Sequence, residues 1–264
     1  MSFTALVLAG SRGGEDPAAA YAGVAHKGLI ELAGETLLAR VVSALDSAGA
    51  ERIAVAADDR ELVAALDQLH PKAALQRLGV AAGPSQTVAA AAGALGTPLL
   101  VTTVDHALLQ ADWVRTFLAD TPADADVAVL VAPEAAVRAA APDSRRTWLK
   151  FRDGRFSGCN LFLLRNDRAL GAVRLWRRVE ALRKQPWRIA LMLGPGMLIR
   201  YALGRLTLDA AVKRLGELAG CRAWAVRTPF GLAAVDVDKP ADLDLVRRLV
   251  GNVSRSSPGP PSAR

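Results

Sequence analysis

The chain has 264 residues, of which 52% are hydrophobic, and a formal net charge of +7 at pH 7. This content can bury a large core, and no apolar run reaches the roughly 18 residues that a membrane-spanning helix needs. The two cysteines, Cys159 and Cys221, indicate neither a disulfide framework nor a zinc site, and we expect them to be small buried hydrophobic residues. The N-terminus lacks a secretory signal pattern, so we expect a cytoplasmic protein.

A buried strand at Thr4 to Leu8 leads into a glycine-rich, basic loop over residues 9–14. Small residues let backbone N–H groups approach phosphate oxygens closely, and Arg12 and the later Lys27 add positive charge. The spacing of the glycines and the lysine fits neither a P-loop nor a dinucleotide fingerprint. We therefore predict a triphosphate site of another kind, with a plain strand-to-helix turn as the alternative.

Helix-like and strand-like segments alternate along the next hundred residues. They are a helix at 35–48, a strand at 52–56, a helix at 60–69, an alanine-rich helix from Ser85, and strands at 98–104 and 126–131. This alternation predicts a mostly parallel sheet flanked by helices. The strand at 98–104 delivers Asp105 to its C-terminal end, the edge where open α/β sheets bind ligands.

The pattern changes after residue 131. We expect a hairpin from residues 148–151 and 160–164, covering the bound nucleotide from above. Three helices follow in a helical insertion at 166–220, parted at Pro186 and around Gly204, before strands at 223–226 and 233–237. Pro240 suits the first turn of a last helix. We predict one domain over residues 1–251 and a disordered tail at 252–264.

The insertion carries most of the charge. Between Arg165 and Arg205 there are ten Lys or Arg residues against two acidic ones, a net charge of +8. Residues 171–205 could lie on an anionic membrane surface, which would make the protein peripheral at the inner membrane. The alternatives are a subunit interface, as in a dimer, or a solvated cap over the core. Nucleic-acid binding is not expected, because no recognition module is present.

The N-terminal motif resembles that of a known family. Leu8-Ala9-Gly10-Ser11-Arg12, followed by Lys27, is similar to the L-A-[AG]-G-x-x-x-R…[PD]-K signature of MobA-like nucleotidyltransferases. The family includes molybdenum-cofactor guanylyltransferases, methylerythritol-phosphate cytidylyltransferases and sugar-phosphate nucleotidylyltransferases. Here His26 replaces the usual Pro or Asp, and the glycine-to-arginine spacing is shorter. The resemblance implies a glycosyltransferase-A-like, Rossmann-like three-layer α/β sandwich with a mostly parallel sheet.

The resemblance also implies a reaction, in which a nucleoside monophosphate moves from a triphosphate to a small phosphorylated acceptor and pyrophosphate is released. Lys27, Arg12 and Asp105 would be catalytic. The nucleotide would be bound by Leu8, Ala9, Gly10, Ser11, Arg12, Gly13, Lys27, Gly83, Ser85, Thr103 and Asp105.

A divalent cation, Mg²⁺ or Mn²⁺, would be held by Asp105 together with Asp238, Asp236 or both. The two later aspartates lie in Val235-Asp-Val-Asp-Lys-Pro-Ala-Asp-Leu243, which is similar to the family's [DN]-[IV]-[DN]-x-P-x-D-L. On a strand they would point to the same side, about 6 to 7 Å apart. If only one of them binds the metal, we favour Asp238. A helix cap is the alternative role for Asp105.

Two further segments extend the resemblance. Residues 82–88 resemble the base-reading segment, where a serine such as Ser85 is typical of the cytidylyltransferase branch; a simple helix N-cap is the alternative. This favours CTP over GTP. Residues 156–161 resemble a segment that contacts the acceptor, which implies Gly158 and Asn160 as acceptor contacts, and we add Lys150. The competing functions are a metal-dependent glycosyltransferase that uses a nucleoside diphosphate-sugar, a non-catalytic nucleotide-binding regulator and a membrane-surface scaffold.

Overall fold

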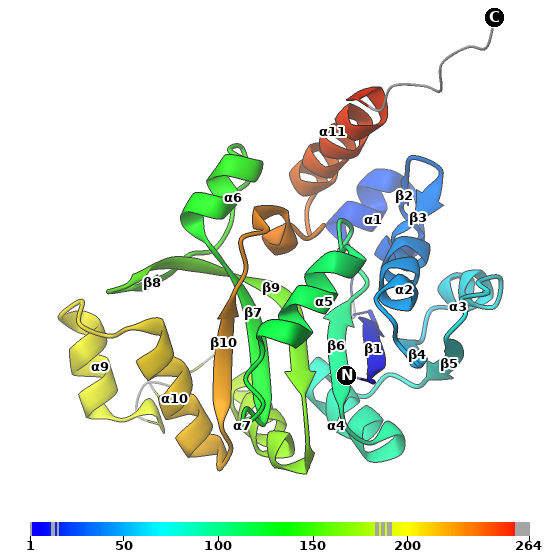
Figure 1. The fold of residues 1–264 in the computed structure, drawn as a ribbon. Helices are drawn as coiled ribbons and strands as arrows, with labels where there is room; N and C mark the ends of the chain where they lie inside the picture. The colour runs from blue at the N-terminus through cyan, green and yellow to red at the C-terminus, as the bar shows by residue number, and fades with distance from the viewer. Residues whose placement is uncertain are drawn as a thin grey trace, which may run out of the picture.

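The computed structural model describes residues 2–11, 14, 16–182, 185, 188 and 192–256, the last five by backbone alone. Strands and helices alternate over most of its length (Figure 1). The strands are β1 (Thr4–Ala9), β2 (Glu31–Leu32), β3 (Glu35–Thr36), β4 (Arg52–Ala57), β5 (Ala74–Leu78), β6 (Leu99–Thr103), β7 (Val127–Pro133), β8 (Leu149–Phe151), β9 (Gly154–Leu164) and β10 (Ala223–Arg227). The helices are α1 (Pro17–Ala22), α2 (Leu37–Ser47), α3 (Arg60–Leu66), α4 (Pro84–Leu95), α5 (Ala111–Asp120), α6 (Glu134–Ala140), α7 (Leu170–Ala181), α9 (Pro195–Ala202), α10 (Leu208–Ala219) and α11 (Pro240–Ser256).

The central sheet has the strand order β10-β7-β9-β6-β1-β4-β5, and β8 pairs with β9. β1 is parallel to β4 and β6, β4 is parallel to β5, and β10 is parallel to β7. Among the described strands of this sheet only β9 runs against this direction, and β8, which is antiparallel to β9, runs with it. The sheet is therefore mostly parallel, as the sequence predicts, and the C-terminal ends of β1, β4 and β6 meet at one edge.

The expectation of a hairpin that lies above the nucleotide is wrong for most of β9. This strand lies inside the sheet, antiparallel to β6 on one side and β7 on the other, with Phe162 opposite Val101 and Val129. The run Leu161–Leu164 has apolar residues on both faces of the strand, which suits a central strand with both faces covered. Only the short β8 stays outside the main strand order, as the hairpin partner of Gly154–Phe156.

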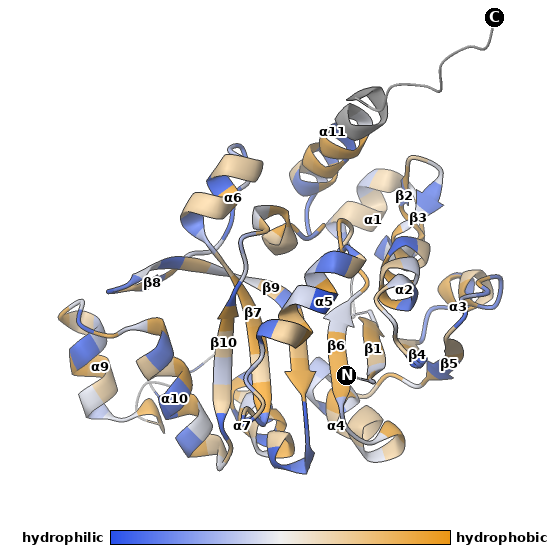
Figure 2. Ribbon diagram, in the orientation of Figure 1, coloured by the Kyte–Doolittle hydropathy of each residue, from blue (hydrophilic) through white to orange (hydrophobic). Residues whose placement is uncertain are grey.

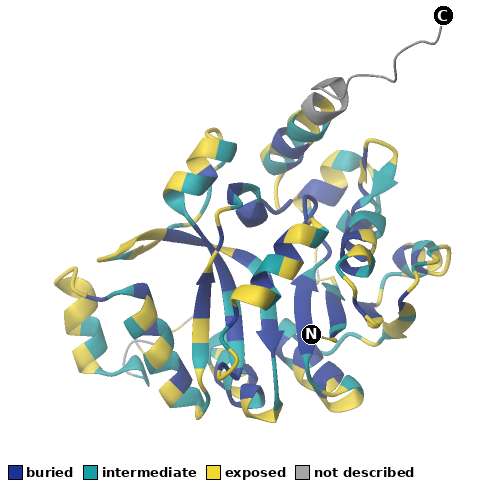
Figure 3. Ribbon diagram, in the orientation of Figure 1, coloured by how far each residue is buried: buried dark blue, intermediate teal, exposed yellow. Residues whose placement is uncertain are grey.

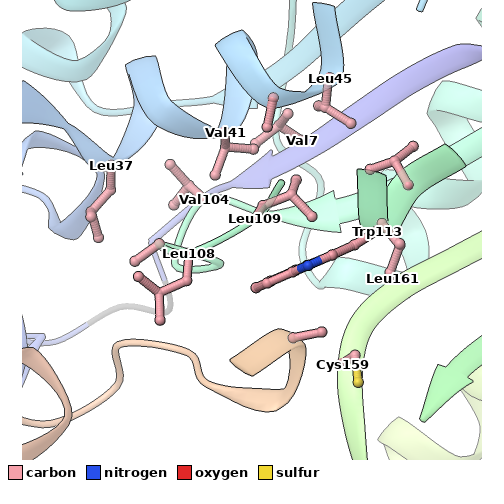
Figure 4. Packing of buried hydrophobic residues seen from close by; sticks show 14 of the residues in the cluster. Val7, Leu37, Val41, Leu45, Val104, Leu108, Leu109, Trp113, Cys159 and Leu161 are labelled. Atoms are coloured by element: carbon pink, nitrogen blue, oxygen red, sulfur yellow. The ribbon is translucent and has the colours of Figure 1, made fainter. Parts of the chain in front are cut away.

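Helices cover both faces of the sheet, whose inner strands β1, β4, β6, β7 and β9 are mostly apolar and buried (Figures 2 and 3), whereas β5 and β8 are largely exposed. Alternate residues of β1 serve the two layers: Val7 packs with the cluster of α2 and α5, while Leu6 packs with that of α4 and α7. Figure 4 shows the first layer, with Trp113 of α5 near Leu161 and Val41 of α2 near Val7. This is the expected three-layer α/β sandwich.

The predicted strand at 233–237 is also wrong. Residues Gly231–Ala234 form a short 3-10 helix, and the segment after it pairs with no strand. Its apolar residues are nevertheless buried in the main core, which explains the strand-like pattern. A side chain at Gly231 would place its Cβ 2.0 Å from the backbone oxygen of Ala136, so this segment packs backbone to backbone against α6. An apolar run alone does not distinguish a buried strand from a buried irregular segment.

The insertion is helical, as predicted, with α7, α9 and α10 in its described part. α9 ends shortly before Gly204, where the sequence predicts a break; Pro186 lies outside the described residues. α11 continues to Ser256, past the predicted start of the tail at Asn252, and the residues after 256 lie outside the description. Among the described helices, none has the length and apolar character needed to cross a bilayer.

Asp126 joins both ends of the insertion to the sheet. Its Oδ1 accepts a hydrogen bond from the side-chain amide of Asn166 (2.8 Å), and its Oδ2 accepts one from the backbone N–H of Arg222 (2.8 Å). The carboxylate is buried, and burial alone would raise its pKa, but these two donors outweigh that effect and hold the pKa below its usual value.

Replacing Asp126 by asparagine should lower the free energy of unfolding at pH 7 by about 1 to 3 kcal/mol, because an amide nitrogen would face one of the two donors. Since the folded-state pKa is depressed, the wild-type advantage is present above about pH 4 and is lost as the pH falls through that pKa. Urea unfolding between pH 7 and pH 3.5 measures both effects. The exposed Asp124→Asn is the control, and a wild-type advantage independent of pH would contradict the assignment.

Candidate active site

The glycine loop begins where β1 ends. A Cβ at Gly10 would lie 2.6 Å from a methyl group of Val80, so only glycine fits there without displacing the loop that follows β5. Ser11 then turns toward the end of β4, where its hydroxyl lies 3.2 Å from the Oδ1 of Asp58. Arg12 and Gly13 lie outside the described residues. The described part of the loop therefore brings the C-terminal ends of β1, β4 and β5 together.

Lys27 lies at the start of a short 3-10 helix, Lys27–Leu29. The buried residue before it, His26, accepts a hydrogen bond from the Gly28 backbone through Nδ1 (2.9 Å), which caps this turn. Burial lowers the pKa of His26, which favours the neutral ring that this bond requires. His26, which replaces the usual Pro or Asp of the family signature, therefore helps to orient Lys27, which matches the signature.

The Lys27 ammonium is surrounded by carboxylates. It forms a close ion pair with Asp105, and its Nζ lies 3.3 Å from Asp238 and 3.9 Å from Asp16. Burial alone would lower the pKa of Lys27, but these carboxylates, above all Asp105, raise it. Lys27 therefore stays charged at neutral pH, as a group that neutralises phosphate oxygens must.

Asp105 and Asp238 converge on this ammonium from two parts of the chain. Asp105 follows β6 and also accepts a close hydrogen bond from the hydroxyl of Thr103, while Asp238 comes from the segment before α11. Burial, and then the nearby carboxylates of Asp105 and Asp236, raise the pKa of Asp238 despite the attraction of Lys27. A carboxylate pair that already holds one cation suits Mg²⁺, which is usually bound by one or two carboxylates together with substrate phosphates.

Asp236 does not join this group. It forms a close ion pair with Arg146 and accepts a hydrogen bond from the amide of Asn160 (2.9 Å). Burial would raise the pKa of Asp236, but Arg146 and the hydrogen bond from Asn160 together outweigh burial and lower the pKa. The expectation that Asp236 and Asp238 share one side of a strand fails because there is no strand here. Nor does any trio of His, Cys, Asp or Glu side chains converge as a metal site within the described residues.

Arg146 is one of the residues that the sequence motifs did not indicate. It stands in an irregular segment between α6 and β8 that carries no motif, so only the fold brings it to Asp236. Its Nε is buried and has no hydrogen-bond partner. Asn160 beside it has φ +48°, a left-handed backbone conformation that costs energy for a residue other than glycine. An unpaired donor and a strained residue at one point are typical of a binding site.

A cavity of about 740 Å³ opens beside these residues. It extends from the predicted acceptor contacts Gly158 and Asn160 to Asp238 and one face of α11. Lys150, exposed on β8, is not among the described residues that line it. The remaining lining residues are Asp143, Arg145, Arg146, Thr147, Leu149, Ser157, Asp236, Lys239, Ala241, Asp242, Asp244, Leu245 and Arg248.

The predicted base-reading segment lies on the other side of β1. Gly83 is the N-cap of α4, so the alternative role of Ser85 as a simple N-cap is wrong. Ser85 lies in the first turn of α4, is fully buried, and donates a close hydrogen bond to Glu180 of α7. Asp242, in the first turn of α11, accepts a hydrogen bond from the backbone N–H of Lys239 (3.0 Å).

Residues 5–185 match the family model of the MobA-like NTP transferase domain. This stretch contains the glycine loop, Lys27, Asp105 and the segment around Ser85. The chain belongs to the MobA-like NTP transferase family. A comparison with curated protein sequences found no match.

Solved structures agree with this membership of the MobA-like family. A structure described as a hypothetical transferase from Thermus thermophilus is 33% identical, with a TM-score of 0.77, over 92% of this chain and 100% of that one. A CMP:2-keto-3-deoxy-manno-octonic acid synthetase complexed with CTP has a TM-score of 0.58 at 17% identity, with 96% and 100% of the two chains covered. The 4-diphosphocytidyl-2C-methyl-D-erythritol synthase of Anaerococcus prevotii has a TM-score of 0.58 at 8% identity, with 95% of this chain and 96% of that chain covered. The last two share the nucleotidyltransferase fold.

Proposed function

We propose that this protein transfers CMP from CTP to a small phosphorylated acceptor and releases pyrophosphate. The observation that carries the proposal is the position of Lys27 between Asp105 and Asp238, because Asp238 also lines the large cavity. Phosphate-binding and acceptor-binding groups therefore adjoin at one edge of the sheet, and the fold is that of a nucleotidyltransferase family.

The reaction needs charge neutralisation more than proton transfer. An acceptor phosphate oxygen is already an anion; it forms a bond to the α-phosphorus as the bond from that phosphorus to the bridging oxygen breaks. Negative charge then grows on the departing pyrophosphate. Lys27, joined by Arg12 as the family resemblance implies, neutralises this charge.

Asp105 and Asp238 would hold Mg²⁺ or Mn²⁺. When bound, such an ion draws charge from the α- and β-phosphates and holds them in position for attack. Lys27 now forms ion pairs with both carboxylates, so it must move its ammonium toward the phosphates as the metal binds.

The acceptor would occupy the cavity of about 740 Å³. Arg146, held by its ion pair with Asp236, lines this cavity, and three further cations that line it form no ion pair within the described part of the chain: Arg145, Lys239 and Arg248. These guanidinium and ammonium groups can each contact an anionic group of an acceptor, and of the aspartates that line the same cavity Asp236 and Asp238 are already paired, with Arg146 and Lys27. This supports a phosphorylated sugar, polyol or acid as acceptor.

Thermal unfolding with each of CTP, GTP, UTP and ATP, with and without Mg²⁺, tests the proposal without knowledge of the acceptor. Binding to the native state at a hundredfold excess over Kd adds about 2.7 kcal/mol of stability. We expect a Mg²⁺-dependent shift that is largest with CTP, followed by pyrophosphate release in a screen of phosphorylated acceptors. A shift with a nucleoside diphosphate-sugar alone would indicate a glycosyltransferase instead, and binding of CTP without turnover of any acceptor would indicate a regulator.

We also propose that the protein works at the inner membrane surface, through α9. This helix contributes no buried side chain to the core, and its residues Ile199 and Tyr201 and the C-cap residue Leu203 are 58%, 54% and 61% exposed. Arg200 and Arg205 beside them form no ion pair with any described residue. A second copy of this basic surface would repel the first, whereas anionic lipid attracts it.

Sedimentation with vesicles of phosphatidylglycerol and phosphatidylcholine should carry the protein down, and phosphatidylcholine alone should not. Replacing Arg200 and Arg205 by serine should weaken binding about thirtyfold, at about 1 kcal/mol for each arginine near an anionic surface. Tyr21→Ser, which removes an exposed aromatic ring from α1, is the control. Equal binding by the arginine variant, or a dimer that is lost when Ile199, Tyr201 and Leu203 become serine, would contradict the proposal.

A further inference from the structure

The strand order separates the two substrates. From Asp105, which follows β6, the sheet continues through β9 to the acceptor cavity on one side and through β1 and β4 to β5 on the other. The acceptor cavity lies on the β9 side of Asp105. A nucleotide whose phosphates lie near Lys27 would therefore have its base on the β5 side. There the loop after β5 crosses back to Gly10 through Val80 and enters α4.

One charged side chain reaches that place from the insertion. Glu180 lies near the C-terminal end of α7, a helix whose exposed face carries Arg174, Arg177 and Arg178. Within the described residues Glu180 pairs with none of them. Its carboxylate instead accepts the hydroxyl hydrogen of Ser85.

The second oxygen of this carboxylate, for which no described residue is a partner, faces the turn before α4. This oxygen, Oε1, lies 3.1 Å from the position that a Cβ would take at Gly83, so no side chain stands between the carboxylate and that turn. The buried Ser85 hydroxyl is bound to the other oxygen, Oε2, which leaves Oε1 as an acceptor. A carboxylate fixed by one oxygen, with the other oriented toward a glycine turn, is suited to bind a ligand N–H.

We propose that Glu180 reads the nucleobase by accepting a hydrogen bond from an exocyclic amino group, with Ser85 as its positioning residue. This inference rests on the proposed function, since it assumes a nucleotide at this edge. Cytosine presents an amino donor at N4, whereas uracil presents a carbonyl acceptor at the same position. Glu180 therefore attracts CTP and repels UTP, which makes it a specificity-determining residue.

The test is Glu180→Gln in the full-length protein, with the Kd of CTP and of UTP measured by calorimetry in the presence of Mg²⁺. The glutamine amide has nearly the same shape and can donate to the uracil carbonyl. We expect the CTP to UTP preference to fall about ten- to a hundredfold, the range for a hydrogen bond to a charged group, through weaker CTP binding and tighter UTP binding. Glu217→Gln on α10, which breaks only an exposed pair with Arg214, should leave the preference unchanged.

A purely structural role for Glu180 predicts a different result. Its negative charge near the N-terminus of α4 stabilises that helix. Loss of this charge would then lower Tm and weaken the binding of all triphosphates by the same factor. An unchanged CTP to UTP ratio in Glu180→Gln, with or without a lower Tm, would overturn the inference and leave the proposed function intact. Failure of the wild-type protein to bind any triphosphate would overturn both.

Discussion

Replacing Lys27 by alanine should lower turnover about 10²- to 10³-fold, the usual cost of removing one donor that stabilises charge in the transition state. No other cation among the described residues forms an ion pair with Asp105 or Asp238. No neighbouring side chain therefore replaces the Lys27 ammonium as pyrophosphate departs. Pyrophosphate release with an acceptor from the screen is the measurement. CTP binding should also weaken.

The control for this variant is Lys72→Ala, which removes an exposed lysine far along the chain. Far-UV circular dichroism and urea unfolding should show that both variants fold. Lys27→Arg should recover little activity, because a planar guanidinium does not replace a point charge between two carboxylates. Turnover of Lys27→Ala within a factor of about three of wild type would remove Lys27 from the mechanism.

The second large effect is expected from Asp105→Asn. This change removes the main counter-charge of Lys27, which lowers the pKa of the lysine toward its ordinary value, and it removes one of the two carboxylates proposed to hold Mg²⁺. Turnover should fall by a factor of about 10³, and CTP binding should lose its dependence on Mg²⁺. Calorimetric titration of CTP with Mg²⁺ and after removal of the metal by EDTA measures the second effect.

Asp112→Asn, an exposed aspartate of α5 paired with Arg115, is the matched control and should behave as wild type. If Asp105→Asn still binds CTP better with Mg²⁺ than without, Asp105 is not a metal ligand. If Asp238→Asn alone abolishes that dependence, Asp238 is the only carboxylate required.

The alternation of apolar segments predicted most of the strands and most of the flanking helices, because a buried strand or an amphipathic helix carries its own pattern, but it missed the largely exposed strand β5 and the helix α5. It failed where burial and strand pairing are separate, as at residues 233–237, which are buried without a strand partner. It also failed for β9, because no local sequence pattern indicates that this strand lies in the middle of the sheet. Strand order depends on contacts between distant residues, which a local pattern does not contain.

For the candidate site, local motifs located Lys27, Asp105 and Asp238, whose ion pairs join three distant segments. They did not locate Arg146 or Glu180. Each of these acts through a partner far along the chain, Asp236 for Arg146 and Ser85 for Glu180. An isolated arginine or glutamate in a basic, polar segment resembles any solvated charge until the fold supplies that partner.

The register around β7 has a consequence for how this chain can change in evolution. Leu164, the last residue of β9, and Ala223, the first of β10, both pair with Val127 from opposite sides. The insertion therefore leaves and re-enters the sheet at two points about 10 Å apart, two strand spacings, whatever its length. Lengthening or shortening the insertion adds only a slowly growing loop-closure cost. The region between these points can acquire new residues, and new binding properties, while the catalytic edge keeps its geometry.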